Sequence, residues 1–552
     1  MKIEMVHSRD HHEVFKINGL YLHSKYKPLE QAEKFAQEKY KKNYIHMLFG
    51  YGNGYLVEAL LNKFSNNEIL IVIDPLIIHH TISPEISRNN VYYFHNEDFR
   101  QIESLINSIE HNYNNQYNII CSFNYDKIFT EEYVEFLKSI RDIQQSKVVN
   151  DNTVLLRAEN WQNNFIDNIE SIIKDGSISY LNEVYSYPVI VASGGPSLTK
   201  QLPLLKKIRE NVILIAAGST INSLLVQHIE PDYILSIDGH ENNWKQFEGL
   251  DLKDSTLIYS MPNHPKIRTK FKDAFCFSSE KNKGINKTFL EKGLGIDLSF
   301  LPGGGSVAHY ALSFANYITI GPIALIGQDL AYTNNQKHAA GNKQISDLDK
   351  LAADFIKIEG YYGEDVLSDI SFNAMKIDFE KMMRNPSLKE KVYNCTEGGC
   401  KIHGMQQLDF SSFTSRFVKK TKISLYKADK KLEESKINSL IIKEQISNCE
   451  EILEKLKVGI KKMNRNKSLI SFDSGTIKAL NEIDKLLQQK LSMLPIQYIM
   501  EHLEIYLAKN SINSDEEYSS QKFRKILQQN LYTYESLERS ISNCLEKLEK
   551  LG

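Results

Sequence analysis

Several residue types that mark special classes of protein are scarce in this chain. Six cysteines and 13 prolines occur among 552 residues, which excludes a disulfide-stapled scaffold and argues against a disordered or fibrous chain. The cysteines are irregularly spaced, as expected in a reducing compartment. No apolar run approaches the roughly 18 residues of a membrane-spanning helix, and the first residues lack the apolar core of a signal peptide. These absences predict a soluble, cytoplasmic protein.

Net charge is scarce as well. The 67 basic and 69 acidic residues leave a formal net charge of −2, whereas non-specific nucleic-acid binding needs a strong positive field. Cys395 and Cys400 are too far apart for a zinc-binding pair, and no Asp-x-Asp motif stands out. We therefore expect no nucleic-acid partner and no protein metal site, and we leave open whether a divalent cation accompanies the substrate.

The remaining composition is an ordinary globular mixture with 42% hydrophobic residues. The length predicts about three or four domains. The expected fold class is α/β, with two Rossmann-like parallel-sheet domains followed by an all-α bundle. The expected parts are an N-terminal α/β domain at 1–150, a helical connector at 151–187, a central α/β domain at 188–418 and a C-terminal helical domain at 419–552.

The N-terminal part carries a loose nucleotide-binding pattern. A predicted strand at 45–49 runs into Gly50, Gly52 and Gly54, and a second strand at 69–73 ends in Asp74. Such glycines admit a phosphate, and an acid about 20 residues further on binds a ribose in dinucleotide sites. The alternative is a tight turn that lets a helix pack on the sheet.

The central part alternates short apolar, β-branched runs with amphipathic segments, which predicts a parallel sheet covered by helices on both faces. The runs lie at 189–192, 212–217, 233–237, 257–259 and 323–326. The main intervening segments lie at 198–209, 220–228 and 306–317.

In the C-terminal part, apolar residues step by three and four over 442–463, 477–494 and 534–551. This spacing predicts helices packed along one another, and we expect the charged run at 419–436 to begin a helix. The bundle would either cap the core or self-associate, or it would dock a protein substrate.

Four predicted strand ends of the central part carry small or polar residues. In an open α/β sheet, ligands bind beyond the carboxyl ends of the strands, and a helix that follows a glycine turn offers amide donors to a phosphate. The residues concerned are Ser193, Gly194, Gly195, Pro196 and Ser197 after the first strand, Gly218 and Ser219 after the second, Asp238 after the third, and Gln328 and Asp329 after the last. The alternatives are a tight strand-to-helix turn and loop acids that cap the next helix.

A second glycine-rich turn, at 301–306, opens another predicted helix. Gly304, Gly305 and Ser306 would form a second anion site, so two such turns suggest a ligand with a phosphate and a further anionic group. His309 lies in the first turn of that helix, where a packing role is the alternative to catalysis.

These motifs, together with the His338–Gly341 segment, the EGYYG at 359–363 and the TEGG at 396–399, resemble the motility-associated-factor (Maf) flagellin glycosyltransferases, whose central domain is called MptE-like. The central part is also similar to bacterial sialyltransferases. The resemblance implies transfer of a nonulosonic acid, pseudaminic or legionaminic, from a CMP donor to serine or threonine of flagellin, and hence a role in flagellar assembly and motility. No cofactor is implied beyond the donor itself.

The resemblance also implies roles for individual residues. Asp238 and Asn242 would lie near the nucleotide, and Asp329 and Tyr332 near the leaving phosphate. His338 is the preferred catalytic base, ahead of Asp329, His240 and His309. The residues expected at the donor are Ser193, Gly194, Gly195, Pro196, Ser197, Gly218, Ser219, Asp238, Asn242, Gly304, Gly305, Ser306, Gln328, Thr396 and Glu397. The chain departs from the family pattern at 400–403, where Cys400, Lys401, Ile402 and His403 follow the TEGG.

Three other functions stay open. MptE-like proteins of other lineages resemble hydroxymethylpterin diphosphokinases that use ATP and magnesium. A non-enzymatic chaperone that binds flagellin through its helical part is the third reading, and methyl transfer by the N-terminal part rests on its glycine pattern alone. A homo-oligomer is compatible with each of them.

Overall fold

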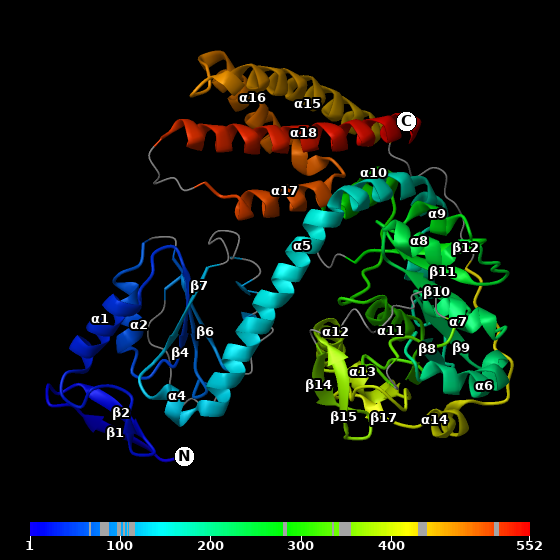
Figure 1. Ribbon diagram of the computed structural model, residues 1–552, viewed down its shortest axis with the longest axis horizontal. Helices are drawn as coiled ribbons and strands as arrows, with labels where there is room; N and C mark the ends of the chain where they lie inside the picture. The colour runs from blue at the N-terminus through cyan, green and yellow to red at the C-terminus, as the bar shows by residue number, and fades with distance from the viewer. Residues whose placement is uncertain are drawn as a thin grey trace. The chain divides into compact units, whose positions relative to one another are not determined.

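The computed structural model describes residues 1–65, 68–77, 88–96, 101–102, 105–106, 109, 116–279, 284–333, 336–341, 355–428, 439–512 and 518–551. The chain forms two compact units (Figure 1). The first contains Met1–Thr153 and Glu504–Asn513, and the second contains Val154–Leu503 and Ser514–Gly552.

A four-stranded parallel sheet forms the centre of the first unit, in the order β6-β5-β4-β7. Its strands are β4 (Ile45–Phe49), β5 (Leu70–Ile73), β6 (Val91–Phe94) and β7 (Tyr117–Cys121). An antiparallel sheet that the sequence did not predict precedes it, formed by β1 (Ile3–His7), β2 (Glu13–Ile17) and β3 (Leu20–Tyr21). The unit's short helices are α1 (Pro28–Lys39), α2 (Tyr55–Leu61) and α4 (Tyr125–Ile128).

The glycine pattern of this unit is used for packing. A Cβ atom on Gly50 would lie 2.5 Å from the ring of Tyr125, so only glycine fits beneath that ring. Asp74 is fully buried, and it accepts hydrogen bonds of 2.6 Å from both the Tyr51 amide and the Tyr125 hydroxyl. Burial raises the pKa of Asp74. Because this carboxylate is bound inside the protein, the expectation that it binds a ribose is corrected.

The helical connector expected at 151–187 is part of a much longer helix, α5 (Thr130–Asp175). Its last turns belong to the second unit. Asn164 and Asn168 donate hydrogen bonds there to the backbone carbonyls of Gly239, Met261, Pro262 and Asn263. This helix therefore supports the loops that follow two strands of the central sheet.

An eight-stranded sheet forms the centre of the second unit, in the order β12-β11-β10-β9-β8-β13-β16-β17, and all its pairings are parallel. The strands are β8 (Val189–Ala192), β9 (Ile213–Ala217), β10 (Tyr233–Ser236), β11 (Thr256–Ser260), β12 (Asp273–Phe277), β13 (Ile323–Ile326), β16 (Val392–Asn394) and β17 (Gln406–Gln407). The expected parallel sheet is confirmed, and the sequence missed β12, β16 and β17.

Alternating side chains of the central strands enter two separate cores. Ile190 and Leu214 belong to the core that also contains the C-terminal helices, whereas Val191 and Ile215 point into the core beneath α11. Both faces are therefore covered, which explains why these strands read as continuous apolar runs.

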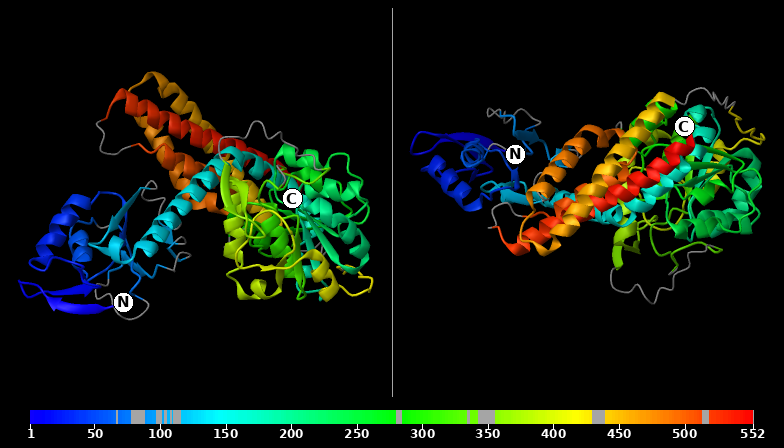
Figure 2. Two further views of the ribbon diagram at one scale, coloured as in Figure 1. Left: turned by 60° about the horizontal axis from the view of Figure 1, so that its bottom comes forward. Right: turned by 90° about the horizontal axis from the view of Figure 1, so that it is seen from above.

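Helices and one hairpin complete the central region (Figure 2). The helices are α6 (Leu198–Ile208), α7 (Thr220–Val226), α8 (Glu241–Phe247), α9 (Pro265–Arg268), α10 (Ile285–Leu294), α11 (Val307–Ile318), α12 (Ile370–Met382), α13 (Pro386–Lys391) and α14 (Phe410–Phe417). The hairpin consists of β14 (Phe355–Glu359) and β15 (Asp365–Asp369).

The C-terminal residues form α15 (Ser439–Arg465), α16 (Ser474–Lys490), α17 (Gln497–Lys509) and α18 (Ser520–Leu551). Helices α15 and α18 lie side by side, as do α15 and α16 (Figure 1), which confirms the helical bundle. None of the described helices is both long enough and apolar enough to cross a membrane.

The charged run at 419–436 does not begin a helix over its described part. Residues 421–428 are extended, and 429–436 lie outside the described residues. The Ile423 amide donates to the Glu210 carbonyl, and the Tyr426 amide donates to the Tyr185 hydroxyl. Because Ile423 and Leu425 pack on the core beneath α11, this segment is held as an extended strap on the sheet domain.

Substituting Gly327 tests how tightly the turns at the end of the sheet are packed. Gly327 has φ +64°, and a Cβ atom would lie 2.8 Å from Cβ of Leu198 and closer still to the Ser193 carbonyl. We expect Gly327→Ala to lower the free energy of unfolding by about 3 kcal/mol. Both tryptophans, Trp161 and Trp244, lie in the second unit, so urea unfolding followed by tryptophan fluorescence measures this loss.

Gly249→Ala is the matched control. Gly249 also has a positive φ of +77°, but its Cβ atom would meet nothing within 4 Å. This variant should therefore lose only the backbone term, about 1 kcal/mol. Equal losses in the two variants would show that the turn packing contributes nothing.

Candidate functional site

A cavity of about 780 Å³ opens at the carboxyl edge of the central sheet, where the strands end. It lies beside β8, at which the order of strands reverses: β9 and β10 follow on one side, and β13 on the other. Such a switch point is where open α/β sheets bind ligands. The volume is in the range of small-molecule sites.

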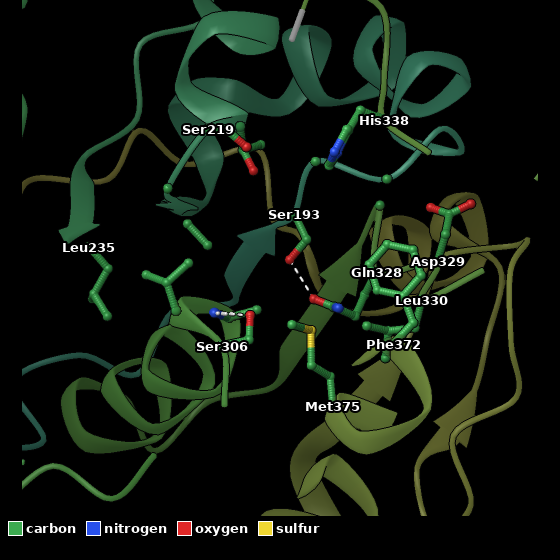
Figure 3. A pocket seen from close by; sticks show the side chains of 18 of the residues that line it. Ser193, Ser219, Leu235, Ser306, Gln328, Asp329, Leu330, His338, Phe372 and Met375 are labelled. Carbon is green, nitrogen blue, oxygen red and sulfur yellow. Dashed lines mark hydrogen bonds between the residues drawn. The ribbon is translucent and has the colours of Figure 1, made fainter. Parts of the chain in front are cut away.

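The cavity brings together residues from all four predicted strand ends and from the second glycine-rich turn. In Figure 3, Ser193, Ser219, Ser306 and His338 surround the same space. The sequence-predicted residues that line it are Ser193, Gly194, Gly195, Gly218, Ser219, Asp238, Gly305, Ser306, Gln328, Asp329 and His338.

The first glycine-rich turn (193–198) is locked to the turn after β13. The Gly195 amide donates to the Gly327 carbonyl at 2.8 Å, and the Ser193 hydroxyl donates to Oε1 of Gln328 at 2.5 Å. A Cβ atom on Gly195 would lie 2.6 Å from the same carbonyl and closer to the Asp329 carboxylate. Gly195 is therefore needed for the close approach of the two turns, whether or not it also contacts a ligand.

The Asp329 carboxylate is bound by its own chain. Its oxygens accept hydrogen bonds from the Ser197 hydroxyl at 2.6 Å, the Ser197 amide at 3.2 Å and the Thr333 hydroxyl at 2.7 Å. Burial raises the pKa of Asp329, and the hydrogen bonds from Ser197 and Thr333 oppose that rise. Its carboxylate joins two turns while the residue also lines the cavity, and the expected role of Asp329 at the leaving phosphate stays a prediction. Ser197, with both its donors on Asp329, does not line the cavity.

The second glycine-rich turn (301–306) also meets an acid of the same chain. The Gly305 amide donates to Oδ2 of Asp378 at 3.1 Å. Ser306 caps α11 and accepts a hydrogen bond from the Ala308 amide at 3.3 Å. His309 accepts from the Ser306 amide, contacts the Met375 carbonyl through its other nitrogen and is fully buried, so its role is packing.

Two basic side chains face the cavity from one short segment. Lys337 and His338 both line it. The adjacent Ala339 amide donates to the Gly194 carbonyl at 2.9 Å, and the Gly194 backbone by itself would raise the pKa of His338. Burial, and secondly the charge of Lys337, lower the pKa of His338 below its usual value of 6.5. His338 is therefore neutral at pH 7 and able to accept a proton.

Several predicted residues lie away from the cavity. The Tyr332 hydroxyl donates to Asp369 at 2.7 Å, and burial raises the pKa of Tyr332 to about 12. Thr396 is buried beneath the turn after β13, where its hydroxyl accepts from the Gln328 amide. Glu397 accepts from the Phe410 amide at the start of α14. The remaining members of this group are Pro196, Asn242 and Gly304.

Other lining residues were missed by sequence reasoning. Asn243 lines the cavity in place of its neighbour Asn242, and it donates to the Ser236 hydroxyl at 2.9 Å and the Asp238 carbonyl at 2.7 Å. Helix α12 contributes Ser371, Phe372 and Met375. Its sequence carries no glycine turn or strand end, so the available signal was only its place in the fold.

Removing the Asp329 carboxylate should lower the stability of the fold more than it weakens ligand binding. In Asp329→Ala, the Ser197 and Thr333 donors lose their buried acceptor, which we expect to lower the free energy of unfolding by about 3 kcal/mol. Asp238→Ala removes an exposed acid at the same edge and should change stability by less than about 0.5 kcal/mol. Urea unfolding measures both. An Asp329→Ala protein of unchanged stability would contradict the assignment of this carboxylate to the turns.

Comparison with known proteins agrees with this architecture. Residues 163–335 match the model of the 6-hydroxymethylpterin diphosphokinase MptE-like family. Among curated proteins, no match was found. The solved structure of a Maf glycosyltransferase from Magnetospirillum magneticum AMB-1 is similar over 100% of this chain and 94% of that chain, with a TM-score of 0.57 and 14% sequence identity. The chain thus has an MptE-like segment at its centre and shares its whole fold with a Maf glycosyltransferase, as its motifs indicate.

Proposed function

We propose that this protein is a glycosyltransferase that moves a nonulosonic acid, of the pseudaminic or legionaminic type, from a CMP donor to serine or threonine hydroxyls of flagellin. The observation that carries the proposal is the cavity of about 780 Å³ at the switch point of the central sheet. The fold shared with a Maf glycosyltransferase supports it. We place the reaction in the cytoplasm, before flagellar assembly.

The cavity offers suitable groups for such a donor. Asp238 is exposed at the end of β10, and its carboxylate is able to accept hydrogen bonds from a ribose. The first turn of α11, beginning at Ser306, directs its positive dipole end to the same space. Phe372, Met375 and Leu330 add apolar surface for the rest of the ligand.

The chemistry assigns His338 as the base. The acceptor oxygen attacks the anomeric carbon, the bond from that carbon to the CMP phosphate breaks, and the acceptor proton passes to the imidazole of His338. Charge then develops on the leaving phosphate, where one well-placed donor is worth about 3–4 kcal/mol. General base catalysis contributes about 10²–10⁴-fold.

The family-model match favours one other candidate, a hydroxymethylpterin diphosphokinase. The matched segment, 163–335, leaves out both sheets of the first unit and the C-terminal helices α15, α16, α17 and α18. A kinase of a small pterin does not need these parts, whereas an enzyme that modifies a protein has a use for them. Glycosyl transfer is therefore our first proposal, and the flagellin chaperone is the third.

The released nucleotide separates these functions. We expect the protein to release CMP and to increase the intact mass of flagellin by one sugar residue when it is given flagellin and a CMP-linked pseudaminic or legionaminic acid. Release of AMP from ATP in the presence of hydroxymethylpterin would show the kinase instead. Flagellin that binds but gains no mass, with neither nucleotide released, would show the chaperone.

The pH dependence tests the base. Since burial lowers the pKa of His338, the imidazole is protonated only below a pKa that lies under 6.5, and kcat/KM should rise with pH to a plateau through that pKa. His338→Gln should lower kcat about 10²–10⁴-fold and abolish this acid limb. His240→Gln, at the N-cap of α8 and outside the cavity, should preserve the limb. An unchanged limb in His338→Gln would reject the assignment.

A further inference from the structure

Both glycine-rich turns already hold a carboxylate of this chain. The Ser197 amide and hydroxyl are bound to Asp329, and the Gly305 amide is bound to Asp378. A donor made of CMP and an acidic sugar carries two anionic groups, the phosphate and the carboxylate on its anomeric carbon. At least one of these groups must therefore find a partner outside the two turns.

Lys337 is a cation available for that purpose. Among the described residues that line the cavity, it is the only lysine or arginine. Its ammonium lies 3.8 Å from Oδ2 of Asp369, beyond hydrogen-bond distance, and its side chain is 27% exposed. The Asp369 carboxylate is already engaged by the Tyr332 hydroxyl at 2.7 Å and the Phe372 amide at 2.8 Å. Among the described residues, no acceptor lies within hydrogen-bond distance of this ammonium, so its donors are open to a ligand that competes with the Asp369 ion pair.

The aromatic surroundings hold this ammonium in place. It lies 5.0 Å from the centre of the Phe372 ring and 5.9 Å from that of the Tyr332 ring. Cation–π contacts of this kind position a lysine without satisfying its hydrogen-bond donors. The site is also partly desolvated, which strengthens a contact with a carboxylate.

We propose that Lys337 is the residue that selects an acidic sugar, because its ammonium binds the carboxylate on the anomeric carbon of the donor. This inference rests on the proposed glycosyltransferase function. The base must lie on the face of the anomeric carbon opposite the leaving phosphate, where the acceptor attacks. Lys337 directly precedes His338 and lines the same cavity, so we place its ammonium at the carboxylate of the carbon that the base faces.

One consequence is that Lys337 and His338 have different roles: Lys337 binds the donor, and His338 accepts the proton. The Lys337 charge helps to keep His338 neutral, as the direction of its pKa shows. When the ammonium is paired with the donor carboxylate, it also orients the anomeric carbon toward the base. A nucleotide without an acidic sugar makes no use of Lys337.

Binding of CMP and of the CMP-linked sugar to the full chain tests the inference. Titration calorimetry, without flagellin, would compare CMP with CMP-pseudaminic and CMP-legionaminic acid in the wild-type protein and in Lys337→Met, which keeps the length and the apolar contact with Phe372. Of the two sugar nucleotides, we consider the one that binds the wild-type protein more tightly. We expect Lys337→Met to lower the affinity for this ligand about 10- to 100-fold and to leave the affinity for CMP unchanged. Lys337→Arg should retain most of the sugar-nucleotide affinity.

Lys270→Met is the matched control, because Lys270 also lies over an aromatic ring, at 5.6 Å from that of Trp244, but outside the cavity. It should leave both affinities unchanged. An equal loss for CMP and the sugar nucleotide in Lys337→Met would assign this lysine to the phosphate and overturn the inference. Unchanged affinities would overturn it as well. If the wild-type protein binds neither ligand, the proposed function itself fails, and the inference fails with it in a distinguishable way.

Discussion

The Asp329 carboxylate joins the turns on which the site is built. The carboxylate accepts hydrogen bonds from Ser197 and Thr333, and the backbone carbonyl of Asp329 accepts a hydrogen bond from the Cys400 amide. The turns after β8, β13 and β16 are held together in this way, around glycines that allow their backbones to touch. Because a buried carboxylate is costly unless its oxygens are satisfied, these turns have little freedom to separate.

This constraint changes what the glycine motifs mean. Glycines at the ends of parallel strands commonly make room for a phosphate. Here Gly195 and Gly327 instead allow the turns after β8 and β13 to approach each other closely. The cavity is left beside the locked turns, and the side chains of Asp238, Lys337 and the neutral His338 line it. Ligand recognition in this protein therefore depends on side chains of the surrounding loops as much as on backbone amides.

The sheet could be predicted well because its strands are buried on both faces. Val189–Ala192 and Ile323–Ile326 are continuous apolar runs, and the structure confirms both to the residue. β12 begins with the exposed Asp273 and contains no β-branched residue, so it gave no comparable signal. The extended strap at 421–428 was wrongly expected to be helical, because a charged sequence does not show that Ile423 and Leu425 pack on the core.

The location of the site could be predicted from the sequence, but the side-chain contacts within it could not. Polar residues that follow parallel strands must meet at one edge, so the sequence located the cavity and part of its lining. Whether a side chain turns into the cavity depends on its local partners: Ser197 and Tyr332 are turned toward Asp329 and Asp369, whereas Asn243 faces the cavity and Asn242 does not. Lys337 was missed because no strand end or glycine motif marks it, and it is placed by the ring of Phe372 on a helix distant in sequence.

A crystal structure of the protein with CMP tests the central claim most directly. The account predicts the nucleotide in the cavity beside β8, with its ribose near Asp238 and its phosphate between the turn at Gly194 and the start of α11. A nucleotide bound at any other place on the chain, or a cavity that stays empty at millimolar CMP, would contradict it.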